Sequence, residues 1–161
     1  MPLDVEEVRN SDRQDKQGCE LNAAKRLIPR RCQEYPQLPL IIGGDDLYGH
    51  EPFIVQLRAL RLYHMLVCKP LSHLELYTWV EDIERLGGCE KGQWHEGPAC
   101  RRRFLPYRIA RSVPVTAVQR VGGTLVEVWE HDRRGQQLYH NAWFTDLEGT
   151  TDNVAAIVRI G

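Results

Sequence analysis

Two adjacent carboxylates, Asp45 and Asp46, follow a short apolar run and are well placed for metal chemistry. Residues 38–42 are almost wholly apolar and are bounded by a proline and a glycine pair, which predicts a strand buried on both faces. Ligands of open α/β sheets bind beyond the carboxyl ends of the strands, and carboxylate oxygens suit Mg²⁺. In the alternative interpretation, one aspartate caps the following helix and the other is solvated.

Basic side chains gather in two places where they could contact the phosphates of a nucleic acid. Lys25 and Arg26 lie on an expected helix, and Arg101, Arg102 and Arg103 precede a β-rich region. Arginine suits phosphate contacts. A solvated face balanced by nearby acids is at least as good an interpretation, because 21 Lys and Arg stand against 22 Asp and Glu. This balance excludes nucleic-acid binding by bulk charge alone.

The cysteines give little support for a zinc site, and the glycine pairs give none for a nucleotide-binding site. Cys89, His95 and Cys100 could ligate zinc, but their spacing matches no paired-ligand motif and a fourth ligand would have to come from elsewhere. The five cysteines contain no Cys-x-x-Cys, which indicates reduced and mostly buried thiols. The glycine pairs are not followed by a phosphate-binding sequence, so a nucleotide-binding fold is excluded.

Hydrophobic periodicity predicts the elements that position these residues. A helix is expected over residues 19–31, with Pro29 ending or kinking it. The strand at 38–42, a helix with Pro52 in its first turn and a strand at 65–68 form a βαβ unit. A capping box at residues 72–75 opens another helix, which a glycine pair closes.

The second half of the chain has a period of two and predicts antiparallel strands. Residues 89–100 are expected to form a loop. Strands are expected at 104–110, 113–120, 124–131 and 136–144, with a hairpin turn at 132–135. A short helix is expected to begin at Thr151 and Asp152. The predicted fold class is therefore α/β with a β-rich second half.

Three segments resemble bacterial insertion-sequence transposases of the DDE type. They are CELNAAKR at 19–26, IGGDDLY at 42–48 and YHNAWFTDL at 139–147. The resemblance runs in order over nearly the whole chain and implies a ribonuclease H-like core. In that family three acidic residues hold two Mg²⁺ or Mn²⁺ ions, which activate the nucleophile and stabilise the leaving oxygen during attack on a DNA phosphodiester.

Only one acidic residue of this triad is matched. Asp45 corresponds to the second one, so the resemblance implies that it is catalytic and a metal ligand. Asp46 stands where the family tolerates other residues. The first Asp and the final Glu of the family fall outside this chain. We therefore expect a central fragment of a DDE transposase that is inactive alone and holds no metal ion tightly.

The resemblance also divides the chain. After an extended lead-in at 1–18, which is expected because these residues are polar and have no sustained period, it implies a partial ribonuclease H-like core at 19–88, a β-rich insertion at 89–147 and the start of a C-terminal core helix at 148–161. A partial core exposes a strand edge and an apolar face, so marginal stability or self-association is expected.

Two other functions stay open, and the expected partners follow from the resemblance. The chain could be a DNA-binding or regulatory fragment that acts on full-length transposase, or a small metal-dependent nuclease that uses Asp45 and Asp46. The expected partners are the DNA of transposon ends, a second copy or full-length transposase. The acidic N-terminus and the lack of an apolar run of ~18 residues predict a cytoplasmic protein with no membrane partner.

Overall fold

The computed structural model describes residues 6–7, 16–97, 103–116, 121–132 and 134–160. Within them the chain forms four helices: α1 (Lys16–Glu34), α2 (Glu51–Ala59), α3 (Leu74–Arg85) and α4 (Val154–Ile160). It also forms six strands: β1 (Ile41–Gly44), β2 (Tyr63–Val67), β3 (Cys89–Glu96), β4 (Arg103–Pro114), β5 (Gly122–His131) and β6 (Gln137–Thr145).

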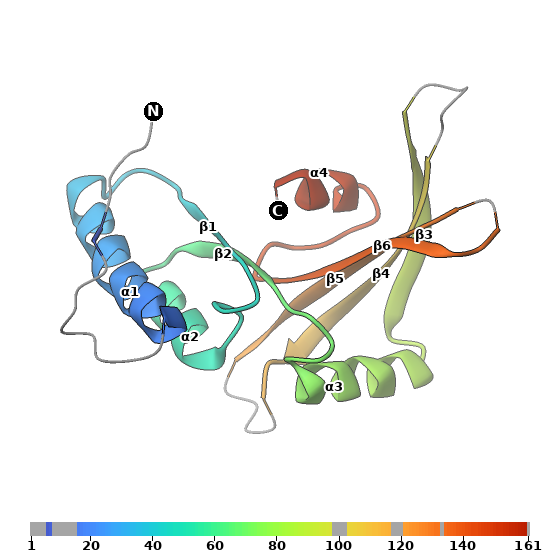
Figure 1. Cartoon of the computed structure of the whole chain (residues 1–161), viewed down its shortest axis with the longest axis horizontal. Coiled ribbons are helices and arrows are strands. Elements are labelled where there is room, and N and C mark those ends of the chain that lie inside the picture. Colours follow the sequence, from blue (N-terminus) through green and yellow to red (C-terminus); the bar gives the residue numbers. More distant parts are fainter. Residues whose placement is uncertain (1–5, 8–15, 98–102, 117–120, 133, 161) are drawn as a thin grey trace.

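The strands make one mixed sheet in the order β1-β2-β6-β5-β4-β3 (Figure 1). β1 and β2 are parallel, and the other neighbouring pairs are antiparallel. The predicted α/β class and the βαβ unit β1–α2–β2 are confirmed. Because β6 pairs with β2, the strands of the β-rich second half continue the same sheet as the βαβ unit.

Helices cover both faces of this sheet. On one face, side chains of α1, α2 and α3 pack with the core residues Leu66, Leu125 and Phe144. On the other face, Val154 and Ile157 of α4 pack with a second cluster of strand residues. None of the described helices is long and apolar enough to cross a membrane.

Helix α1 begins earlier and ends later than expected. It starts at Lys16, inside the expected lead-in, and continues through Pro29 to Glu34. Proline has no N–H to donate to the carbonyl four residues earlier, which here belongs to Lys25. That carbonyl accepts a hydrogen bond from the side-chain amide of Gln56 on α2, at 3.2 Å. The neighbouring helix thus replaces the missing donor, and the helix does not end at Pro29.

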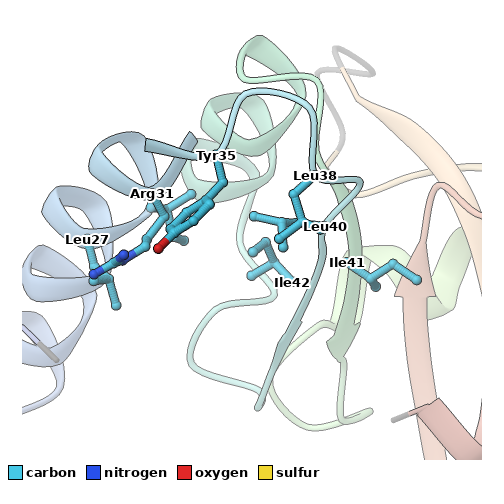
Figure 2. A pocket seen from close by; sticks show the side chains of 8 residues that line it. Leu27, Arg31, Tyr35, Leu38, Leu40, Ile41 and Ile42 are labelled. Atoms are coloured by element: carbon cyan, nitrogen blue, oxygen red, sulfur yellow. The ribbon is translucent and has the colours of Figure 1, made fainter. Parts of the chain in front are cut away.

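Strand β1 corrects the expectation of a strand buried on both faces. The strand is Ile41–Gly44, and its residues are exposed or half-buried. In the described residues it pairs only with β2, so it is an edge strand. An apolar hollow of about 290 Å³ lies between it and α1. Figure 2 shows Leu40 and Ile42 directed toward α1, whereas Ile41, which is 42% exposed, points away.

Two expectations in the second half were wrong in detail, and a third was confirmed. Residues 89–96 form strand β3 instead of a loop, and the strand pairs with β4 along its whole length. The expected strands at 104–110 and 113–120 are largely one strand, β4, with an irregularity between Ala110 and Val113 where Ser112 has φ 57°. Residues 117–120 lie outside the described part. The hairpin turn at 132–135 is confirmed by the bond from Gly135 N–H to the Asp132 carbonyl, at 3.0 Å.

The capping box before α3 does not form, although the helix does. His73 occupies the N-cap position, and no side chain caps the helix there. Ser72 instead lies beside Asp46, and their interaction lowers the pKa of Asp46. The side chain that the local motif would use therefore faces a distant segment.

Candidate functional site

Asp45 lies just beyond the carboxyl end of β1, where the chain turns toward α2. Its carboxylate accepts the N–H of Leu47 at 3.0 Å, and its carbonyl accepts the N–H of Tyr48 at 3.1 Å. Both bonds are local and shape a tight turn. The residue is exposed, so a carboxylate reaches solvent at the end of a parallel strand, as the sequence predicted.

The neighbouring Asp46 has a different environment. Its carboxylate accepts the N–H of Lys69, in the loop after β2, at 2.6 Å, and lies 3.2 Å from Nε2 of His73. Burial raises the pKa of Asp46, but the bonds from Lys69 and Ser72 and the nearby His73 outweigh it and hold this pKa below its ordinary value. Asp46 therefore joins the loops that follow the two parallel strands.

His73 and Cys68 complete the buried contact between these loops. The ring of His73 is almost fully buried and stacks on that of His50, with centroids 4.9 Å apart. Burial lowers the pKa of His73 although the negative charge of Asp46 opposes it. The thiol of Cys68 faces the carbonyl of Gly49 at 4.0 Å, and burial raises its pKa to about 12. A thiol in this state is not a nucleophile.

Tyr48 lies in the turn that begins at Asp45. Burial raises the pKa of Tyr48, and the negative charges of Glu20 and Asp45 raise it further. The ring of Tyr48 also packs against Phe53, with centroids 5.2 Å apart. Neither Tyr48 nor His73 carries a motif or spacing that predicts a role in the site. The single signal for Tyr48 is its place in the IGGDDLY segment.

A hollow of about 610 Å³ opens beside Asp46 between the loop after β2 and the first half of β6, and His140 lies in its wall. Nε2 of His140 is 2.7 Å from Oε1 of Glu127, whose side chain is nearly fully buried. Arg108 donates to the other oxygen of Glu127 at 2.9 Å. The ring of Trp129 stacks on His140, with centroids 5.3 Å apart. These contacts hold the imidazole of His140 at the edge of the hollow.

The basic residues proposed for DNA contact are not brought together. Lys25 and Arg26 lie on α1, at one end of the molecule, whereas Arg103 lies on β4 in the far half of the sheet (Figure 1). Arg26 pairs with Glu6 at 2.9 Å, and Arg103 pairs with Glu96 at 2.8 Å and with Glu130 at 3.2 Å. Arg101 and Arg102 lie outside the described residues. The observed pairs favour balanced surface charge for the arginines that are described.

The possible zinc ligands do not converge either. Cys89 and His95 stand at opposite ends of β3, and six residues of strand span about 20 Å. Cys100 lies outside the described residues. Across the described part of the chain, no group of three or more His, Cys, Asp or Glu side chains could hold a metal ion. Asp45 supplies the oxygen chemistry that Mg²⁺ or Mn²⁺ prefers, but the described residues do not fit a complete two-ion site.

Comparison with known proteins adds no functional assignment. No family model matches the sequence, and a search of curated proteins gives no match.

Proposed function

We propose that this chain is a central fragment of a DDE transposase with a ribonuclease H-like core, and that Asp45 is the second acidic residue of its catalytic triad. The observation that carries the proposal is the position of Asp45. It is an exposed carboxylate at the carboxyl end of the first parallel strand of a βαβ unit, within the IGGDDLY segment. Ligands of open α/β sheets bind at this edge.

The fragment is proposed to be inactive alone. In the complete enzyme, two divalent ions activate the nucleophile and stabilise the leaving oxygen. The described residues give Asp45 no partner ligands for such ions, so no cleavage step is assigned to this chain. Its own contribution is to hold one carboxylate at the end of β1.

A nicking assay tests this proposal. The purified chain is incubated with supercoiled plasmid and Mn²⁺, beside Asp45→Ala and the matched surface variant Asp82→Ala. We expect no nicking above buffer from any of the three proteins. Nicking that persists through repurification and disappears only in Asp45→Ala would overturn the proposed inactivity and would favour a small metal-dependent nuclease.

The alternative function, a small metal-dependent nuclease, requires Asp45 and Asp46 to hold a metal ion together. The carboxylate of Asp46 is instead engaged by Lys69 and His73, so the structure offers no support for a shared ion. The regulatory alternative requires DNA binding that weakens as the salt concentration rises. A gel shift with transposon-end DNA at several salt concentrations tests it, and the absence of any shift at low salt would exclude it.

A further inference from the structure

Asp46 lies next to the proposed catalytic carboxylate, and its half-buried side chain contacts the loop after β2. It receives the main-chain N–H of Lys69 at 2.6 Å and lies 3.2 Å from the buried His73 ring. Neither contact is local, because Lys69 is 23 residues farther along the chain and His73 lies beyond Lys69. The carboxylate of Asp46 therefore spans the gap between the two loops at the carboxyl end of the parallel strands.

The surroundings of this contact leave the loop after β1 little freedom. A side chain at Gly49 would lie 2.9 Å from Cys68 Sγ and from the Val67 carbonyl, and 3.0 Å from a ring carbon of His73. The loop backbone thus rests directly on the end of β2 and on His73. The stacked ring of His50 covers His73 from the same loop.

From this geometry we infer that Asp46 is a positioning residue for Asp45, which it holds in place by tying the loop after β1 to the loop after β2. The two residues are adjacent, and the tight turn at Asp45 continues directly into the tied segment. A fixed carboxylate loses less conformational freedom when it engages a ligand. The inference rests on the proposed function for the role of Asp45, and it assigns to Asp46 a role that the resemblance does not.

Amide hydrogen exchange on the whole chain, without metal or DNA, tests this inference. The variants are Asp46→Ala, Asp46→Asn and the matched control Asp82→Ala, whose side chain makes an exposed pair with Arg85 on α3. In Asp46→Ala we expect exchange at Leu47, Tyr48 and Lys69 to become about fivefold to tenfold faster, the loss expected for one or two hydrogen bonds. Core amides of β5 should keep their rates.

Asp46→Asn keeps an oxygen that accepts the Lys69 N–H, so it should restore wild-type exchange to within about twofold. This variant also preserves the test if Asp46→Ala fails to fold. The inference is overturned if exchange at Leu47 and Tyr48 stays unchanged, if it rises only in proportion to all other amides, or if Asp46→Asn is as damaging as a folded Asp46→Ala. Because the assay contains no DNA or metal, its failure is distinguishable from a failure of the proposed function in the nicking assay.

Discussion

At the residue scale, the least expected feature is a buried carboxylate in the middle of the sheet. Glu127 is 2% exposed, and its two oxygens are engaged by His140 and by Arg108. Arg108 also pairs with Glu84 at the end of α3 and lies over the ring of Trp129. A buried charge is tolerated only when it is paired and hydrogen-bonded, so these residues form one coupled unit.

Truncation of Glu127 should therefore be costly. Glu127→Ala leaves Arg108 half-buried without its main partner, and we expect the free energy of unfolding to fall by about 3–5 kcal/mol. Urea denaturation measures this loss. Glu34→Ala removes an exposed pair with Arg31 and should change stability by about 0.5 kcal/mol or less. Losses of similar size in the two variants would show that the Glu127 contacts are not coupled as described.

Acid should destabilise the fold through His73 and the carboxylates. The pKa of His73 is lowered in the fold by burial, so below about pH 6.5 the unfolded chain takes up this proton first and unfolding is favoured. The pKa of Asp146 is also lowered, because bonds to His64 outweigh burial. Its stabilising effect exists above the unfolded pKa of about 4 and is lost as the pH falls through the folded pKa.

Urea denaturation between pH 7 and pH 3.5 should therefore show a falling free energy of unfolding that begins below about pH 6.5. His73→Gln should abolish the part of the fall above about pH 5. His131→Gln changes an exposed histidine and should leave the profile as in the wild type. A flat wild-type profile from pH 7 to pH 5 would contradict the role given to His73.

At the element scale, the continuation of α1 through Pro29 depends on α2. Proline inside a helix costs about 3 kcal/mol, partly through the hydrogen bond it cannot make. The amide of Gln56 satisfies the carbonyl that this leaves open. The same contact fixes α1 against α2 over the face of β1 and β2, so one side chain supports both the helix and its packing.

This dependence predicts non-additive substitutions. Gln56→Ala should lower the free energy of unfolding by about 1 kcal/mol in the wild type. In a Pro29→Ala background, the main-chain N–H of the substituted residue can donate to the same carbonyl, and the loss from Gln56→Ala should shrink to a few tenths of a kcal/mol. A double-mutant cycle in urea measures the coupling, and strictly additive losses would disprove the proposed compensation.

At the scale of the whole molecule, β1 is an edge strand of the sheet that the described residues form. Ile41 and its partner Tyr63 on β2 are 42% and 50% exposed. The four residues of β1 carry no charge that would discourage pairing with another strand. An edge strand that is partly exposed and uncharged favours self-association.

Sedimentation velocity should therefore show association that increases with protein concentration. Ile41→Lys places a charge on the edge strand and should shift the distribution toward monomer. Leu71→Lys changes an exposed leucine in the loop after β2 and should leave the association unchanged. A wild-type chain that stays monomeric at all concentrations and melts cooperatively would disprove this expectation.

Several features were determined by sequence alone because their signals are local. The apolar run, the helix beginning near Pro52 and the second apolar run were enough to predict the βαβ unit, and the spacing placed Asp45 at the end of its first strand. The turn at 132–135 was predicted from its glycine and polar residues. Each of these signals depends on neighbours within a few positions along the chain.

Other features were decided only by the tertiary structure. β3 lacks an apolar alternation because it is an edge strand, so its pairing with β4 could not be predicted from hydrophobicity. The partners of Asp46 and Glu127 come from distant segments, and so does the donor that lets α1 pass Pro29. A side chain's burial and partners depend on which elements become neighbours. For these residues, packing across the sheet determines which elements become neighbours, and the local sequence does not.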